Sequence, residues 1–431
     1  MGSQTPPQRP GIPTTTTTTT PTLIKWVLDT RPLWPEAKQT KDLSSAAARA
    51  LALLTPDERS GVLRYYHVKD AKLALGSALL KRLAIVRCAG VPWQDTLPGR
   101  DARTHKPVFR VPRSRDGPAA ITPASASETA ADRGGEEGAG GSGYDDDEDD
   151  YTEPLLFNVS HQAGLVVLLA LSAPPSRTTA IGVDIVCPSE RRTRDREMIS
   201  REGWPRYVAM HEDVFSPGEA ARLRALEWTL QLPLARTGAG SVTHAGASAG
   251  ADTGESKGQD RTDVMLAHFY ALWCLREGYV KMTGDALLAP WLRDLDMRNV
   301  APPPRPPPPP PPPPPASTVT SVNAPATATA TATTVADGAT PPGLEIWLRG
   351  ERVCDADVRL EWLLGDEYMV CTAVRWGHRD SSDNGNGTDG GGMAADEAEA
   401  EAVMMASPFV RLDVEQVLAE AEAAADGSAW A

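Results

Sequence analysis

The amino-acid sequence predicts an α/β (α+β) fold, because strand-like and helix-like patterns occur in both halves of the chain. Short apolar runs typical of strands occupy residues 24–28, 155–172 and 180–186, and three more follow between 344 and 376. Stretches between these runs carry apolar residues at helical spacing. Sheets and helices of this kind bury their apolar faces against one another, so we expect helices packed on sheets.

Low-complexity blocks separate the patterned segments. Of the 431 residues, 39 are proline and 36 are glycine, and they are concentrated in blocks that cannot form a core. Without these blocks roughly 280–300 residues remain, enough for one unit of two lobes. The expected segments are a disordered tail at 1–21, an N-terminal lobe at 22–180 with a disordered insertion at 113–153, a C-terminal lobe at 181–420 with disordered insertions at 236–261, 299–342 and 378–402, and a tail at 421–431.

Charge and cysteine content exclude several classes of protein. The net charge of −14 argues against general nucleic-acid binding. The five cysteines show no metal-binding spacing, as in reduced intracellular proteins. Neither a secretory signal nor an apolar run of membrane-spanning length is visible. We therefore expect a cytosolic protein that binds neither nucleic acid nor membranes.

The N-terminal lobe begins with one strand and two helical patterns. The strand covers residues 24–28, and an Ala/Leu-rich helix is expected at 43–54. Thr55 then supplies a helix cap, with Pro56 at the first helical position. From there we expect a second helix that continues to residue 86.

Asp184 is the most informative residue of the following strands. It lies in the run AIGVDIV, and burial of an ionised carboxylate is costly unless it is paired or binds a metal. Mg²⁺ prefers oxygen ligands, so an aspartate at this place suits phosphate chemistry. A simple turn cap at the strand end is the alternative.

The motif FNVSH joins an earlier strand to a polar loop. Its residues Ser160 and His161 are adjacent in sequence, so they are not expected to form a nucleophile–base pair. A hydroxyl and an imidazole together suit phosphate binding better. A purely structural joint is the alternative.

The central helix is expected to begin at Thr262 or Asp263 and to end at Gly284. It brings Glu277 and Lys281 one turn apart. The simplest interpretation is a stabilising pair, worth roughly 0.2–0.5 kcal/mol. Before this helix a capping box is predicted at Ser216 and Glu219, and after it three strands at 344–350, 358–364 and 367–376 and a short element at 409–418.

Common phosphate-binding motifs are missing from the sequence. It contains no GxxxxGK[ST] loop, no GxGxxG after a strand and no HExxH. Any phosphate chemistry would therefore depend on scattered basic residues and on an acid-held Mg²⁺.

Taken together in this order, RYYHVKDAKLALGSALLKR, THKPVF, FNVSHQAGLVVLLA, IGVDIV, FSPGEAARL and WCLREGYVKMTGDAL resemble the 4′-phosphopantetheinyl transferases of the large Sfp type. The resemblance spans about residues 24–420. It is greatest to the eukaryotic form that activates aminoadipate reductase and the fatty-acid, polyketide and peptide synthases. It implies two α/β lobes related by a pseudo-twofold axis, with coenzyme A bound between them.

The resemblance also implies roles for individual residues. Asp184 and Glu277 match the Mg²⁺-binding acids, Glu277 would take the proton of the carrier-protein serine, and Lys281 would stabilise the departing 3′,5′-ADP. These three are the expected catalytic residues. The expected coenzyme A contacts are Arg100, His105, Lys106, Asn158, Ser160 and His161.

Three positions depart from the family pattern. Val186 stands where many bacterial relatives have a second acid, so a site with two protein carboxylates and water is expected. Arg276 replaces the lysine of the W-x-x-K-E motif, and His105 replaces the usual glycine.

The implied reaction transfers the 4′-phosphopantetheine arm of coenzyme A to a serine of apo acyl-carrier or peptidyl-carrier domains, including that of aminoadipate reductase. A monomer would suffice, since one chain supplies both lobes. Two other functions stay open: an interaction protein that uses its proline tract at 302–315, and another Mg²⁺-dependent phosphotransfer enzyme.

Overall fold

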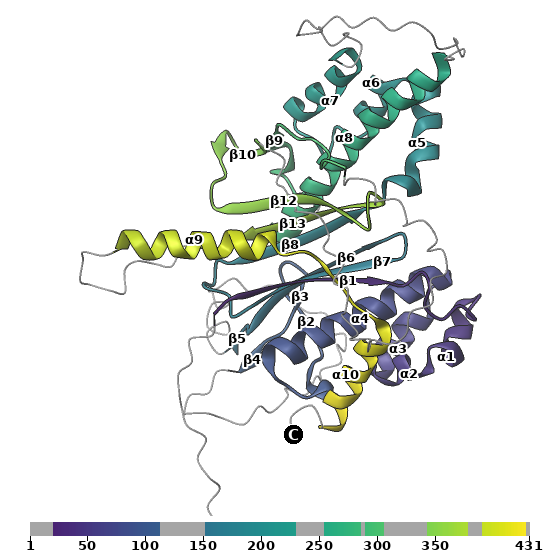
Figure 1. Cartoon of the computed structure of the whole chain (residues 1–431), viewed down its shortest axis with the longest axis vertical. Coiled ribbons are helices and arrows are strands. Elements are labelled where there is room, and N and C mark those ends of the chain that lie inside the picture. Colours follow the sequence, from purple (N-terminus) through teal and green to yellow (C-terminus); the bar gives the residue numbers. More distant parts are fainter. Residues whose placement is uncertain are drawn as a thin grey trace, which may run out of the picture.

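Two β-sheets lie face to face at the centre of the molecule, and helices cover the outer face of each sheet (Figure 1). The structure is a computed structural model, and it describes residues 20–112, 151–229, 254–285, 289–305, 343–377 and 390–427. This layered architecture confirms the predicted α/β class. Within the described residues, no helix combines the length and apolar character needed to cross a membrane.

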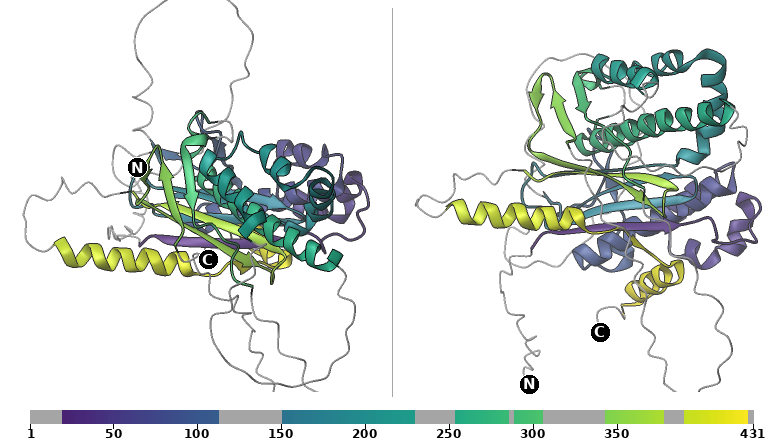
Figure 2. Two further views of the ribbon diagram at one scale, coloured as in Figure 1. Left: turned by 90° about the horizontal axis from the view of Figure 1, so that it is seen from above. Right: turned by 45° about the horizontal axis from the view of Figure 1, so that its top comes forward.

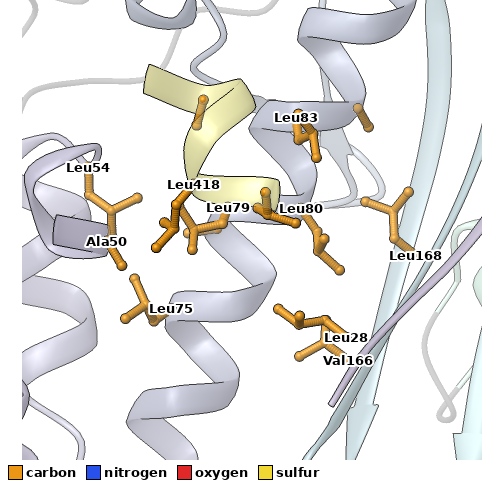
Figure 3. Close-up of a cluster of buried hydrophobic side chains, with 14 of the residues drawn as sticks. Leu28, Ala50, Leu54, Leu75, Leu79, Leu80, Leu83, Val166, Leu168 and Leu418 are labelled. Carbon is orange, nitrogen blue, oxygen red and sulfur yellow. The ribbon is translucent and has the colours of Figure 1, made fainter. Parts of the chain in front are cut away.

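The sheet of the N-terminal lobe has the strand order β14-β1-β7-β6. Its strands are β1 (Thr22–Asp29), β6 (Leu155–Gln162), β7 (Leu165–Ser172) and β14 (Val410–Arg411). The predicted strands at 24–28 and 155–172 are thus confirmed. Helix α4 (Val68–Ala89) covers the outer face, where its leucines meet Leu28, Val166 and Leu168 of the sheet (Figure 3).

The helices before α4 are shorter than predicted. They are α1 (Leu43–Ala46), α2 (Ala48–Ala52) and α3 (Pro56–Leu63). Thr55 caps α3 as expected. The second predicted helix breaks between α3 and α4, where His67 is extended and Tyr66 is 91% exposed. The aromatic residues there have modest helix propensity and bury no apolar face, so little opposes a turn that redirects α4 onto the sheet.

The C-terminal lobe repeats the topology of the N-terminal lobe. Its main sheet has the order β12-β13-β8, formed by β8 (Ala180–Val186), β12 (Ala356–Leu363) and β13 (Tyr368–Arg375). In each lobe the first strand, β1 or β8, precedes a long helix, and a hairpin, β6–β7 or β12–β13, follows that helix. The second strand of the hairpin lies in the sheet between the first strand of the lobe and the first strand of the hairpin. This equivalence is what the pseudo-twofold expectation requires.

Four helices and a small sheet complete this lobe. The helices are α5 (Pro188–Glu202), α6 (Trp204–Ala209), α7 (Pro217–Thr229) and α8 (Gly254–Thr283). The small sheet contains β9 (Leu295–Arg298), β10 (Glu345–Leu348) and β11 (Glu351–Arg352). The predicted capping box at the start of α7 is present, since Ser216 Oγ accepts from the Glu219 N–H at 3.1 Å. Two short strand pairs precede β6 in the chain, β2 (Gly99–Arg100) with β3 (Pro107–Val108) and β4 (Val111–Pro112) with β5 (Tyr151–Thr152).

Some helices extend into segments for which the sequence predicted disorder. Helix α8 begins at Gly254, so the predicted start at Thr262 or Asp263 is wrong. Asp263 instead accepts from Arg196 of α5 at 2.7 Å, which ties the two helices together. Residues 390–402 belong to α9 (Gly390–Ala406), and 421–426 belong to α10 (Val414–Asp426). The rest of the predicted tails and insertions lies largely outside the described residues.

The C-terminal segment returns to the N-terminal lobe (Figure 2). Strand β14 pairs in parallel with β1, and α10 buries Leu418 in the core beneath the first sheet (Figure 3). Residues from 409 onward, which the sequence placed with the C-terminal lobe and the tail, therefore pack on the other lobe. The apolar residues of β14 and α10 are more than 300 residues from β1 and α4 in the sequence, so the spacing of apolar residues could not predict these contacts.

A buried ion pair crosses the largely apolar interface between the two sheets. Lys25 of β1 donates to Glu361 of β12 at 2.7 Å and to the Met405 carbonyl at 3.3 Å, and its Nζ lies 4.9 Å from the Phe409 ring centre. Burial lowers the pKa of Lys25, and the Glu361 carboxylate opposes that shift. This pair links both lobes with the C-terminal segment.

We predict that Lys25→Met destabilises the fold by about 3–5 kcal/mol, because Glu361 is left as a buried charge without its partner. The double variant Lys25→Met/Glu361→Leu should recover most of this loss. Urea unfolding measures both. As a control, Glu420→Gln removes an exposed pair with Arg87 and should change stability by less than about 1 kcal/mol. If Lys25→Met were as stable as the control Glu420→Gln, the prediction would be contradicted.

Candidate active site

Helix α8 lies unusually close to strand β8 because two glycines face the contact. A Cβ atom on Gly182 of β8 would lie 2.3 Å from the Gly278 carbonyl oxygen and the Met282 nitrogen of α8. A Cβ atom on Gly278 would lie 2.4 Å from the sulfur of Cys371. No larger side chain fits at either place without moving the helix. The glycines thus bring the polar residues of α8 next to Asp184.

Asp184, Ser160 and Lys281 form a closed polar triangle. Lys281 Nζ lies 2.6 Å from Asp184 Oδ1 and donates to Ser160 Oγ at 2.9 Å. Ser160 Oγ in turn donates to Asp184 Oδ1 at 2.9 Å. The three side chains come from β8, β6 and α8, so the site joins both lobes. Asp184 is only 5% exposed, and this pairing removes the cost of burying its charge.

Glu277 lies one turn before Lys281, but the two side chains form no ion pair within the described residues. Burial and the nearby negative charge of Asp184 raise the pKa of Glu277 to about 7, while Lys281 acts in the opposite direction. The simple Glu277–Lys281 pair is therefore replaced by a Lys281–Asp184 pair between two elements. A carboxyl group with this pKa can accept a proton near neutral pH.

The donor set at this site fits Mg²⁺. Among the described residues, no group of three or more His, Cys, Asp or Glu side chains is placed to hold a metal. Mg²⁺ commonly binds one or two carboxylates and takes its other ligands from water and substrate phosphates. Asp184 and Glu277 are near enough for the charge of one to raise the pKa of the other. Val186 packs in the core of the C-terminal lobe, so it supplies no third ligand.

His161 and Asn158 occupy different environments at the end of β6. His161 is exposed to the site, and partial desolvation together with Lys281 lowers its pKa. Asn158 is buried, and its Oδ1 accepts from the Val183 N–H at 3.0 Å. This bond links the two sheets, so the Asn158 carbonyl group is already used in a structural contact.

Arg100 ends β2, and His105 and Lys106 lie in the tight loop that joins β2 to β3. Asp101 organises the loop by accepting from the backbone N–H groups of Arg103 and Thr104, at 3.1 and 2.7 Å. Arg100 donates to the His105 carbonyl at 3.0 Å. His105 has a φ of 56°, a left-handed conformation that favours glycine, which explains why glycine is usual in the resembling family.

Lys106 connects this loop to the C-terminal end of α8. Its Nζ donates to the Met282 carbonyl at 2.8 Å, an acceptor that the helix itself leaves open. Thr104 packs beside Gly284, where a Cβ atom would lie 2.7 Å from its methyl group. Burial, with Arg103 adding to it, lowers the pKa of Lys106 to about 8.

A cavity of about 350 Å³ lies between α4, the β6–β7 turn and α5, and none of the predicted site residues lines it. It is lined in part by Lys69 and Lys72 of α4, Gly164 of the β6–β7 turn and Glu190 of α5. Asp70, whose charge acts on His161, also lines it. A larger cavity of about 850 Å³, between α9 and the strands β10 to β12, contains none of the predicted site residues.

Several supporting residues escaped the sequence analysis. Gly182 and Gly278 set the helix–strand distance, and Asp101 shapes the loop. Arg276 points away from the site and is buried, with Glu219 at 2.6 Å and the Leu295 carbonyl at 2.8 Å. The role of Asp101 could have been predicted, because an aspartate at the start of a polar turn commonly accepts from backbone N–H groups two or three residues later. The glycine contacts involve segments 96 residues apart, for which a single sequence gives no signal.

Comparison with known proteins identifies close relatives. A family model described as "4′-phosphopantetheinyl transferase, N-terminal" matches residues 41–121. The chain is 41% identical over 404 residues to 4′-phosphopantetheinyl transferase 1 of Fusarium mangiferae, covering 94% of this chain and 97% of that protein. It is 32% identical over 367 residues to a 4′-phosphopantetheinyl transferase of Aureobasidium melanogenum, covering 82% and 90%. It is 29% identical over 413 residues to 4′-phosphopantetheinyl transferase NpgA of Emericella nidulans, covering 94% and 95%.

We predict that Gly182→Ala displaces α8 and destabilises the protein, because the added methyl group would overlap helix backbone that cannot rotate away. The expected loss is about 1–3 kcal/mol or more. Gly61→Ala is the control, since nothing lies within 4 Å of that Cβ position in α3. It should be neutral or stabilise by up to about 1 kcal/mol. Thermal and urea unfolding measure the stability of both variants. Equal stability of Gly182→Ala and Gly61→Ala would show that the close approach at Gly182 does not require glycine.

Proposed function

The chain belongs to the 4′-phosphopantetheinyl transferase family, and from this premise we propose that Asp184, Glu277 and Lys281 catalyse the transfer with Mg²⁺. The family's enzymes, class EC 2.7.8.7, move the phosphopantetheine arm of coenzyme A to carrier proteins. The observation that carries the residue assignment is the convergence of two carboxylates and a lysine where the lobes meet.

In the proposed reaction, the hydroxyl oxygen of the carrier serine bonds to the phosphorus that carries the pantetheine arm. The bond from that phosphorus to the oxygen of the departing 3′,5′-ADP breaks, and the serine proton passes to Glu277. In the metal-free site the pKa of Glu277 is raised to about 7, and its ionised carboxylate is the proposed acceptor of the serine proton. Lys281, with a flexible stem and three donors, neutralises charge on the departing phosphate.

Asp184 and Glu277 are the proposed Mg²⁺ ligands. When bound, the ion would supply Lewis-acid stabilisation of the pyrophosphate charge. Ser160 would keep the Asp184 carboxylate oriented through its hydrogen bond of 2.9 Å. The protein contributes position and electrostatics more than covalent chemistry.

The coenzyme A contacts are proposed on the N-terminal side of the site. Arg100, His105 and Lys106 supply basic groups from the β2–β3 segment, which Lys106 bonds to the last turn of α8, and His161 lies near enough to Lys281 for that charge to lower its pKa. Ser160 is also a proposed contact, for which its O–H would turn from Asp184 to a phosphate. The Asn158 amide, with its oxygen engaged by Val183, is the weakest of the proposed contacts. Positive and uncharged donors of this kind suit phosphate groups.

Carrier domains of aminoadipate reductase and of fatty-acid, polyketide or peptide synthases are the proposed targets, which would place the enzyme in lysine biosynthesis and secondary metabolism. We also propose that it acts as a cytosolic monomer, since one chain supplies both halves of the site. Family membership favours this function over a proline-dependent interaction protein and over another phosphotransfer enzyme. Most of the tract at 302–315 lies outside the described residues.

We predict that the purified chain, given coenzyme A, Mg²⁺ and an apo carrier domain, adds one phosphopantetheine arm that mass spectrometry detects on the carrier. EDTA, Glu277→Gln and Asp184→Asn should each lower the rate by at least about 100-fold, since each removes a catalytic or metal-binding group. Gly61→Ala, remote from these residues, serves as the folded control. Full activity in EDTA would overturn the metal assignment, and full activity of Glu277→Gln would overturn the base.

A second prediction concerns Lys106 and pH. Its pKa of about 8 is lowered by burial, and a bound phosphate would raise it again. At about pH 8 roughly half of the ligand-free molecules carry a neutral Lys106, so Lys106 should contribute an uptake of about half a proton to coenzyme A binding there and almost none at about pH 6, measured as the difference from Lys106→Arg, which shares the titration of the coenzyme A phosphates. Calorimetry in buffers of different ionisation enthalpy measures this. Lys106→Arg should abolish the uptake; an unchanged value would exclude Lys106 as its source.

A further inference from the structure

We propose that Lys281 is an internal counter-ion of Asp184, which must release that carboxylate before a divalent cation can bind. Coenzyme A, by offering its phosphates to the ammonium group, would then promote metal binding. This inference rests on the proposed function, because it assigns a ligand-free role to two residues of the proposed site.

The arrangement around Asp184 carries the argument. Its Oδ1 accepts from both Lys281 Nζ, at 2.6 Å, and Ser160 Oγ, at 2.9 Å. Ser160 Oγ also accepts from Lys281 at 2.9 Å, so the serine holds the ammonium group against the carboxylate. The ammonium therefore occupies one of the two carboxylate oxygens that a cation could use. Two positive charges on one buried carboxylate oxygen repel each other.

Lys281 has a simpler partner that it does not use. Glu277 lies one turn away on the same helix, the spacing of an ordinary helix ion pair. In the part of the chain that the structure describes, Glu277 forms no hydrogen bond or ion pair, whereas Lys281 spans to the neighbouring strand. The Lys281 ammonium group therefore pairs with Asp184, and the Glu277 carboxylate has no such partner among the described residues.

Lys281 also has room to move. Its side chain is 29% exposed, against 8% for Asp184, and its four-carbon stem carries a compact charge. A phosphate anion beside Lys281 would draw the ammonium group away and expose Asp184 Oδ1. Coenzyme A and the metal would then each raise the affinity of the other, as linkage requires.

A permanent Lys281–Asp184 pair is the competing possibility. In that case the lysine would be needed to keep the buried carboxylate ionised and oriented. Removing Lys281 would then weaken metal binding or leave it unchanged. The two possibilities therefore predict opposite effects of the same substitution.

The test uses Mn²⁺ as a paramagnetic substitute for Mg²⁺ and measures its affinity for the full chain by electron paramagnetic resonance, with and without coenzyme A. Without coenzyme A, Lys281→Met should bind Mn²⁺ at least about tenfold more tightly than the unaltered chain. The factor by which coenzyme A tightens Mn²⁺ binding should shrink correspondingly. Lys281→Gln, which keeps a hydrogen-bond donor but no charge, should behave in the same way.

Two controls accompany these variants. Lys106→Met removes an ammonium group that contacts Met282 but not Asp184, so it should change Mn²⁺ affinity by less than about threefold without coenzyme A. Asp184→Asn should abolish Mn²⁺ binding at this site, both in the otherwise unaltered chain and in combination with either Lys281 substitution. Circular dichroism verifies that each variant is folded.

Unchanged or weaker Mn²⁺ binding by folded Lys281→Met and Lys281→Gln overturns the counter-ion role. If the unaltered chain modifies a carrier domain normally, that failure concerns this inference alone. If it binds no Mn²⁺ even with coenzyme A, the proposed metal site and this inference fail together.

Discussion

The close packing of helix α8 on strand β8 determines where the groups of the active site lie. Gly182 and Gly278 allow backbone and side chains to approach to a distance that any Cβ atom would prevent. Only at this distance can Lys281 reach Asp184 across the gap between helix and strand. Helix α4 of the other lobe approaches its sheet in a similar way at Gly76, where a Cβ atom would lie 3.1 Å from Leu28. Both helix–sheet contacts thus contain a glycine, but the closer one, at Gly182, lies in the lobe that carries Asp184 and Glu277.

The site also depends on bonds between the lobes. Ser160 of the first sheet completes the triangle with Asp184 and Lys281 of the second lobe. Asn158 fixes the neighbouring strands, and Lys106 holds the loop of the N-terminal lobe on the last turn of α8. Because these contacts join the lobes, a shift of one lobe against the other would separate the proposed coenzyme A contacts from the proposed catalytic residues. The buried Lys25–Glu361 pair and the C-terminal segment oppose such a shift.

Charge is distributed unevenly between the two carboxylates. Asp184 is paired with an ammonium group, while Glu277 is half-buried beside a negative charge and has its pKa raised to about 7. This difference separates a residue suited to hold positive charge from one suited to accept a proton. Arg276, adjacent in sequence to Glu277, faces the opposite side and stabilises Glu219 and the start of β9. Neighbouring positions of one helix therefore face the proposed site and the folded core separately.

The sequence by itself determined the α/β class, the main strands and the end of α8 at Gly284, because local apolar patterns lie in consecutive residues. It also singled out Asp184, Glu277 and Lys281 as the candidate site residues, because the family motifs that contain them are short and local. The tertiary structure decided the Lys281–Asp184 pairing, the structural use of Asn158, the start of α8 at Gly254 and the return of α10 to the first lobe. Each of these depends on contacts between segments far apart in the chain. Their energies come from burial and from partner geometry, and neither can be read from the spacing of residues along one strand or helix.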